Sequence, residues 1–229
     1  MNTTKNKDLR IAYVINERKF KELEAIMKNV SEDITYDVDC IDGTSIVFTS
    51  LDDLLKFPNR KEKQYKRIEV STPYLTDRIS ITFSNYDFRS ISYRVSGDER
   101  NVDFYSGQVE SFLMSLRPWY SFIGAGNFIS SMIGFFLLFM CLTYILVLLN
   151  IYKSIDTWGI IIISIIVYSL YEKMKGFLFP VASFELGDGI ERVKMKGSIR
   201  NLILGSIGLA GVLGFLVNQI PPLRSLLGY

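Results

Sequence analysis

Hydrophobic and polar positions alternate along much of the first 117 residues. Residues 78–84 and 89–96 place an apolar side chain at every second position, which predicts strands with one buried and one solvated face. Residues 9–15 and 65–72 are further candidate strands. Between these runs the spacing changes to that of a helix. The apolar residues of this segment are Phe20, Leu23, Ile26, Met27 and Val30.

Local signals mark where these elements begin, turn and end. Asn16 can cap the helix that follows it, and Ser50 can cap a short helix that Pro58 ends. Asp42-Gly43 lies between two alternating runs, which predicts a hairpin. The last helix of this region is expected over 99–117. The sequence therefore predicts an α+β domain over 1–117, with a mostly antiparallel sheet and two covering helices.

The pattern changes after residue 117. Most of the 26 Lys and Arg and 24 Asp and Glu residues precede Pro118, and long uncharged stretches follow it. Residues 118–229 are expected to form an α-helical transmembrane region with three spans, at about 122–149, 157–172 and 201–220. A bilayer core of about 30 Å needs roughly 20 apolar residues, so the second stretch is short for a span.

The distribution of positive charge sets the expected orientation of these spans. Segment 172–200 is interpreted as a basic cytosolic loop, whereas 150–156 carries only Lys153. The sequence thus predicts a multi-pass protein of the bacterial inner (plasma) membrane, with the N-terminal domain in the cytoplasm. The basic residues of the loop are Lys173, Lys175, Arg192, Lys194, Lys196 and Arg200.

Small residues recur through the third predicted span. Glycine stands at every third position, and a row of small residues four apart runs beside it. Small side chains allow helix backbones to approach closely in lipid, so these residues are interpreted as a helix-packing surface. Its partner could be another span or a second copy of the chain. The residues are Gly205, Ser206, Gly208, Ala210, Gly211 and Gly214.

The residue inventory argues against an enzyme. The chain has no histidine, which excludes histidine bases, histidine zinc ligands and histidine-activated nucleophiles. Its two cysteines, Cys40 and Cys141, lie in different regions and are expected to be free thiols. No phosphate-binding loop, dinucleotide fingerprint or nucleophile elbow occurs. No catalytic residue, cofactor or metal site is expected.

Basic residues concentrate between 56 and 67. They could bind an anion or a nucleotide, or they could belong to a solvated loop between two elements. Two arginines in the following strands are added as weaker candidates for the same ligand. The full set is Lys56, Arg60, Lys61, Lys63, Lys66, Arg67, Arg89 and Arg94.

A small cytosolic domain joined almost directly to short spans is similar in architecture to membrane effectors of bacterial anti-phage defence systems. That resemblance implies a nucleotide or oligonucleotide ligand and an oligomer that forms a pore or ion channel. We therefore expect a non-enzymatic integral membrane protein whose cytosolic sensor domain controls a homo-oligomer in the lipid bilayer. The alternative is a membrane-anchored binding or adaptor module without pore activity. An extended nucleic-acid surface is not expected, because the net charge is only +2.

Overall fold

The computed structural model describes residues 2–73, 77–85, 90–124, 131–132, 134–136, 139–140, 143–144 and 157–219. The chain divides into two compact units, Met1–Ile190 and Glu191–Tyr229. Nearly all described strands and helices belong to the first unit, and the second consists mainly of one helix.

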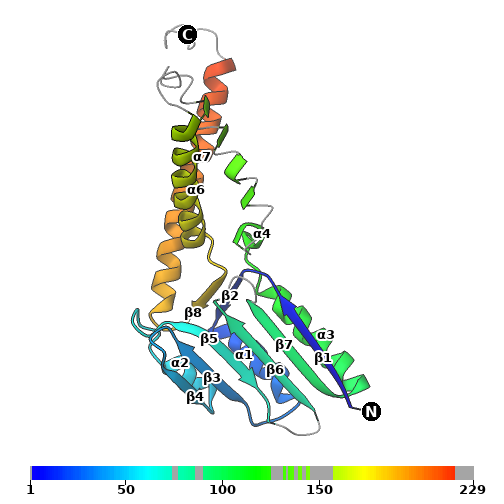
Figure 1. The fold of residues 1–229 in the computed structure, drawn as a ribbon. Helices are drawn as coiled ribbons and strands as arrows, with labels where there is room; N and C mark the ends of the chain where they lie inside the picture. The colour runs from blue at the N-terminus through cyan, green and yellow to red at the C-terminus, as the bar shows by residue number, and fades with distance from the viewer. Residues whose placement is uncertain are drawn as a thin grey trace. The chain divides into compact units, whose positions relative to one another are not determined.

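The core of the first unit is a six-stranded sheet in which every pair of neighbours is antiparallel (Figure 1). Its order is β1-β7-β6-β5-β3-β4. The α+β class with an antiparallel sheet is therefore what the structure shows. The strands are β1 (Asn2–Leu9), β3 (Thr35–Cys40), β4 (Ser45–Phe48), β5 (Tyr65–Ser71), β6 (Arg78–Ser84) and β7 (Ile91–Asp98).

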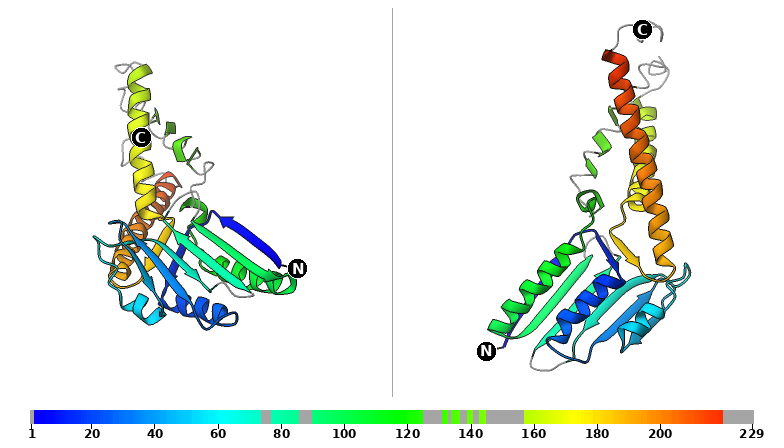
Figure 2. Two further views of the ribbon diagram at one scale, coloured as in Figure 1. Left: turned by 60° about the horizontal axis from the view of Figure 1, so that its bottom comes forward. Right: turned by 180° about the vertical axis from the view of Figure 1, so that it is seen from behind.

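Helices cover one face of this sheet. They are α1 (Glu17–Lys28), α2 (Leu51–Lys56) and α3 (Glu99–Ser115), and Figure 2 shows them on the same side. The predicted helix cap is confirmed for α1, because the Asn16 side chain accepts a hydrogen bond from the Lys19 N–H at 3.0 Å. Phe20, Leu23 and Met27 of this helix are buried in the core between helices and sheet.

The predicted hairpin is also confirmed. β3 and β4 pair on either side of Asp42-Gly43. Gly43 has a φ of +86°, a conformation that favours glycine, and the Asp42 carboxylate accepts a hydrogen bond from the Thr44 N–H at 3.0 Å. Two local interactions thus determine where this pair of strands turns.

The N-terminal strands differ from the prediction. Instead of one strand over 9–15, β1 ends at Leu9 and a separate strand, β2 (Tyr13–Asn16), follows it. The Ser90 hydroxyl holds the break, because it bonds to the Leu9 and Ile11 carbonyls and to the Ile11 N–H. β2 then pairs in parallel with β8 (Ala182–Glu185). The sequence of β1 shows no apolar alternation that would have predicted this strand. An edge strand with polar side chains on its wet face needs only backbone pairing.

The structure gives bounds for α4 (Ser121–Gly124), α6 (Thr157–Leu178) and α7 (Gly189–Gln219) among the described residues that follow α3. Within the described residues, no helix is both long enough and apolar enough to cross a membrane. The predicted transmembrane region of three spans is therefore wrong for the described helices. Most of the expected span at 122–149, and the side chains of 201–220 beyond Leu209, lie outside the described residues.

For α6, the short uncharged part and the charges that follow it explain this correction. The span expected at 157–172 is part of a longer helix. α6 continues through Glu172, Lys173 and Lys175 to Leu178. Its uncharged part is 15 residues, below the roughly 20 that a bilayer requires. α7 begins at Gly189 and carries Arg192, Lys194 and Lys196 in its first turns.

Conclusions that depended on those spans are corrected with them. The described helices do not support an integral membrane protein, a pore or ion channel of an anti-phage effector, or a membrane-anchored adaptor. The same finding overturns the predicted multi-pass location in a bacterial inner membrane. The resemblance to membrane effectors depended on the same expected spans and carries no further argument.

Candidate functional site: a basic loop between α2 and β5

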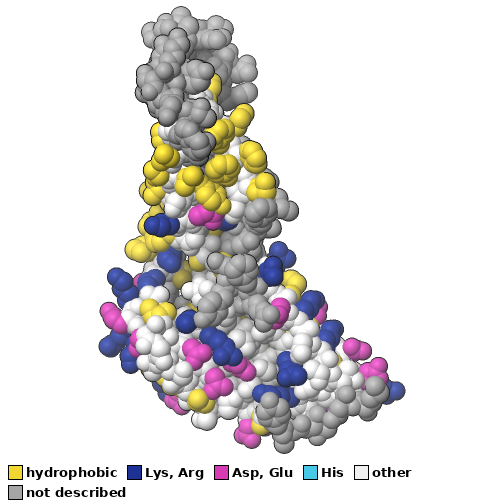
Figure 3. Space-filling view, in the orientation of Figure 1, with side chains coloured by type: hydrophobic (Ala, Val, Ile, Leu, Met, Phe, Trp, Pro, Cys, Tyr) yellow, Lys and Arg dark blue, Asp and Glu magenta, His cyan; other side chains and the backbone are white. Residues whose placement is uncertain are grey.

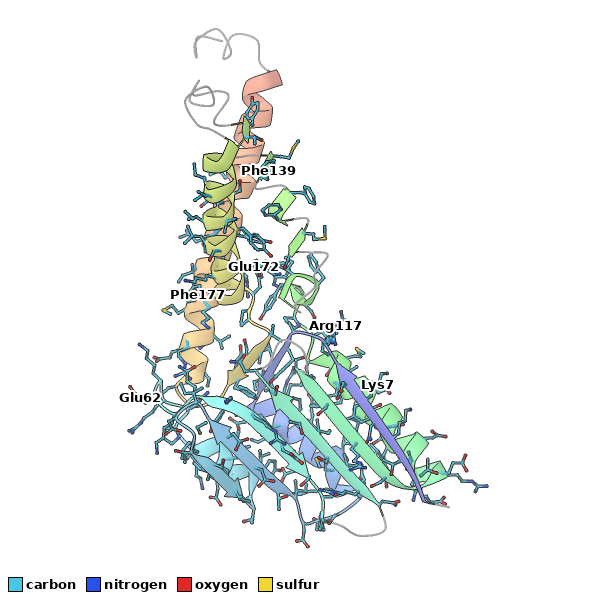
Figure 4. All side chains as sticks on the ribbon, viewed as in Figure 1. Lys7, Glu62, Arg117, Phe139, Glu172 and Phe177 are labelled. Carbon is cyan, nitrogen blue, oxygen red and sulfur yellow. The ribbon has the colours of Figure 1, made fainter. Side chains whose placement is uncertain are left out.

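The basic cluster of the sequence divides in the structure into an exposed loop and two strand residues. We define the basic loop as residues 56–64, from the last residue of α2 to the residue before β5. Lys56, Arg60, Lys61 and Lys63 are all exposed on it. Glu62, labelled in Figure 4, marks its outer edge and is the one acidic residue among them.

Buried groups hold this loop in place. Asn59 is only 2% exposed, and its side-chain oxygen accepts a hydrogen bond from the Tyr65 N–H at 3.2 Å. The Tyr65 hydroxyl donates to the Leu54 and Phe57 carbonyl oxygens at 3.3 and 3.2 Å. Burial raises the pKa of this hydroxyl, so it stays protonated as a donor. The loop is therefore an anchored turn with charged residues on its outside.

A second segment of the same unit supports the loop from below. Gly187 lies in the turn after β8 with a φ of +49°, and a Cβ there would stand 3.0 Å from the Asn59 nitrogen and 3.4 Å from the Phe57 carbonyl oxygen. A side chain would therefore push the loop out of place. Sequence reasoning missed this support, although Gly187-Asp188-Gly189 is a visible turn signal.

The charges of the loop are only partly compensated. Lys63 lies near Asp42, and the pKa of that carboxyl is lowered first by the hydrogen bond from Thr44 and further by the lysine. No salt bridge joins Lys56, Arg60 or Lys61 to an acidic residue within the described part of the chain. These three cations therefore remain available to an external anion.

Arg67 is used by the protein itself. Its side chain lies on the uncovered face of the sheet, where it forms salt bridges with Asp39 at 3.5 Å and with Glu69. Lys66 is exposed one position earlier, on the side that alternation turns away from Arg67. The structure thus separates Arg67 from the other members of the predicted cluster.

The two predicted arginines of the later strands do not join the basic loop. Arg89 lies outside the described residues. Arg94 is exposed on β7 and faces Ser80 of β6, which in turn faces Ser71 at the far end of β5. Ser71 lies six positions along β5 from Tyr65, so Arg94 lies roughly 20 Å along the strands from the loop.

The uncovered face of the sheet is polar, and Figure 3 shows it with few hydrophobic side chains. Asp37 and Glu69 face each other across β3 and β5. Burial, and then the neighbouring Glu69 carboxylate, raise the pKa of Asp37. Sequence reasoning recognised one wet face but not this pair, because strand register is set by tertiary pairing. The described residues contain no group of three or more potential metal ligands placed to hold an ion.

A groove between α1 and α3 was also not predicted. It encloses about 930 Å³ and includes Lys19, Ile26, Phe104, Gly107 and Ser111 in its walls. The Lys19 ammonium is already bonded within the groove, to Glu22 at 2.7 Å and to Ser115 at 3.0 Å. The groove therefore offers no uncompensated charge comparable with that of the basic loop.

The predicted helix-packing residues lie on α7, in the second unit. Gly205, Ser206 and Gly208 are exposed, and a Cβ at either glycine would meet no atom within 4 Å. The Ser206 hydroxyl donates to the Leu202 carbonyl oxygen within the helix. The side-chain surroundings of Ala210, Gly211 and Gly214 lie outside the described residues. Helix packing through this row stays a prediction.

Comparison with known proteins adds no functional assignment. No protein-family model, curated protein or solved structure matches the chain.

Proposed function

We propose that this chain is a non-catalytic binding protein whose basic loop holds a compact phosphate-bearing ligand of the nucleotide type. The observation that supports it best is the combination of three exposed, uncompensated cations with a buried anchor. Lys56, Arg60 and Lys61 lie within six residues of one another on a turn that Asn59 holds in place. An anchored turn loses less conformational entropy on binding than a mobile loop does.

The extent of the cluster indicates a ligand of small size. Beyond the basic loop, several described basic residues of the first unit are paired, as Lys7 is with Glu110 and Lys28 with Glu24. Arg67 is paired as well. A duplex would require a longer basic surface, whereas two or three phosphate groups match the loop.

The absence of histidine from the sequence favours binding over turnover. Nucleotide hydrolysis usually requires bound magnesium and a positioned base or water, and no metal-ligand group of three lies in the described residues. The cations of the loop can neutralise phosphate charge but cannot accept a proton at neutral pH. Binding without hydrolysis is therefore the expected activity.

The test is a titration of the full chain with a nucleoside triphosphate, and separately with a short single-stranded oligonucleotide and with inorganic phosphate. Lys56→Gln, Arg60→Gln and Lys61→Gln are combined in one variant. The matched control combines Arg18→Gln, Lys21→Gln and Lys28→Gln on α1, which removes the same charge from residues already paired with glutamates. Thermal unfolding of both variants checks that the fold is intact.

We expect the loop variant to bind the triphosphate roughly 10- to 100-fold more weakly and the control to bind normally, because the control removes cations that are already compensated. Affinity should also fall with rising salt. Equal losses in both variants would mean that only net charge matters, and would contradict the proposal. Binding of the oligonucleotide alone, with a steep salt dependence, would replace the compact ligand by a nucleic acid.

A further inference from the structure

One side of α6 carries an apolar stripe. It consists of Ile162, Ile165, Ile166, Leu170 and Met174, each between 52% and 60% exposed. Their spacings of three, one, four and four residues keep them on one side of the helix. Figure 3 shows hydrophobic side chains gathered over this helix. Within the described part of the chain, α6 therefore presents a half-exposed apolar stripe about 18 Å long at 1.5 Å per residue.

The rotation of α6 is fixed by contacts on its other side. Lys175 is only 7% exposed, and its ammonium donates to the Ser131 hydroxyl at 2.8 Å. The Tyr168 ring packs edge-on against Phe135, with centroids 5.3 Å apart. Glu172 and Phe177, labelled in Figure 4, leave the helix on different sides. The stripe is therefore held outward by polar and aromatic contacts that a rotated helix would lose.

The exposed area of the stripe suits a helix–helix interface. Five half-exposed aliphatic side chains present on the order of 400 Å², a size at which patches usually mark an interaction site. A standard interface buries about 800 Å² per partner, so the stripe accounts for about half of one. Ser169 and Gly176 are exposed beside it, and a Cβ at Gly176 would meet no atom within 4 Å. These small residues leave room for close approach of a second helix.

We propose that a second copy of this chain covers the stripe, with the two α6 helices antiparallel about a two-fold axis between Ser169 and Leu170. This axis sets Ile165 of one copy beside Met174 of the other, and the stripe is then self-complementary. Lys173, an exposed residue on the same side of α6 as the stripe, comes beside Ile166 of the other copy and can extend its ammonium past the edge while its methylene groups stay in contact. The two helix dipoles are antiparallel in this arrangement, which is their favourable orientation.

This inference does not depend on the proposed anion site, because α6 and the basic loop share none of these residues. Its first test is a disulfide. Ser169→Cys in a Cys141→Ser background places one exposed thiol per chain next to the two-fold axis, while the remaining Cys40 is buried. Mild oxidation of the full chain should give a covalent dimer in high yield. The control is Thr49→Cys, which is exposed on the loop after β4 and should give little dimer.

The second test removes the apolar character of the stripe. Ile165→Glu with Leu170→Glu places four carboxylates in the dimer, away from the partner's Lys173, and should weaken association at least about 100-fold. Val47→Glu changes an apolar residue of 63% exposure on β4 and should leave association unchanged. Light scattering over a dilution series measures both variants, and circular dichroism checks that each retains its helix content.

Three outcomes would overturn the proposal. The first is a wild-type chain that is monomeric across the dilution series without cross-linking through Ser169→Cys. The second is a dimer that survives Ile165→Glu with Leu170→Glu. The third is a monomer in which the cysteine of Ser169→Cys resists a thiol-reactive reagent, which would mean that another segment of the same chain covers the stripe. A dimer that is lost in the stripe variant and retained in the Val47 variant supports it.

Discussion

α1 and α6 both repeat apolar residues at helical spacing, yet they place them in opposite surroundings. α1 buries Phe20, Leu23 and Met27 in the core and forms charge pairs such as Lys21–Glu17 on its outside. α6 has polar and aromatic contacts on its inner side and aliphatic residues exposed on its outer side. Helical periodicity therefore shows that a helix has an apolar face. It does not show whether the chain itself covers that face.

α1 and α6 also differ in the surroundings of one lysine each. Lys19 of α1 is bonded to Glu22 at the surface side of a groove, whereas Lys175 of α6 is almost completely buried. The Lys175 ammonium also lies 3.9 Å from the Glu172 carboxylate. A buried ammonium needs such partners, because an unpaired charge in an apolar environment is strongly destabilising.

The largest difference in stability should appear when a buried apolar residue of α1 and an exposed apolar residue of α6 are each replaced by alanine. Phe20→Ala empties a fully buried site and should lower the free energy of unfolding by about 3–5 kcal/mol. Ile166→Ala should cost less than about 1 kcal/mol in the monomer and act mainly on self-association. Urea unfolding followed by circular dichroism, at a concentration where the chain is monomeric, measures both. Similar losses at the two positions would remove the distinction between α1 and α6.

The next largest difference in unfolding free energy should separate Lys175 of α6 from Lys19 of α1. Lys175→Ala removes a buried ammonium and leaves the Ser131 hydroxyl without its donor, so it should lower the free energy of unfolding by about 1–3 kcal/mol. Lys19→Ala should cost less than about 1 kcal/mol, because its partner Glu22 is substantially exposed. Denaturant titration of both variants at neutral pH decides this. If Lys19→Ala is the more damaging, the inner contacts of α6 contribute less than their burial indicates.

Two helical glycines with open space beside them test the proposed role of α6 in self-association. A Cβ at Gly107 of α3 or Gly176 of α6 would meet nothing within 4 Å, so alanine at either should stabilise the monomer by about 0.5–1 kcal/mol. Only Gly176→Ala should change self-association, because Gly176 lies beside the apolar stripe. Thermal unfolding and light scattering separate the two effects. An equal influence of both variants on association would place the interface elsewhere.

The smallest effect concerns pH. Glu110 of α3 has its pKa lowered first by the hydrogen bond from the Tyr93 hydroxyl and then by Lys7, whose ammonium lies 3.1 Å away. A lowered folded-state pKa contributes stability above the ordinary glutamate pKa, and this contribution is lost as pH falls through the lowered value. The melting temperature of wild type should therefore fall more than that of Glu110→Gln between pH 6 and pH 3. Identical slopes would show that this pairing is not coupled to folding.

The candidate site shows a similar division between prediction and structure. Residue types alone indicated a basic segment at 56–67, and four of its exposed cations, Lys56, Arg60, Lys61 and Lys63, lie on the basic loop. The neutralisation of Arg67 by Asp39 and Glu69 was not predictable, because it depends on how β3 and β5 are aligned. The placement of Arg94 far from the loop likewise depends on the pairing of β5, β6 and β7.

Sequence by itself determined the features that depend on neighbouring residues: the cap of α1 at Asn16, the turn at Asp42-Gly43 and the alternation of β6 and β7. Each of these rests on hydrogen bonds or side-chain periodicity within a few residues, so the signal is local. Only the tertiary structure decided the parallel pairing of β2 with β8, which brings together residues more than 160 positions apart. It also decided the direction of the apolar stripe on α6. The contacts that turn this helix, from Ser131 and Phe135, come from a distant segment of the chain.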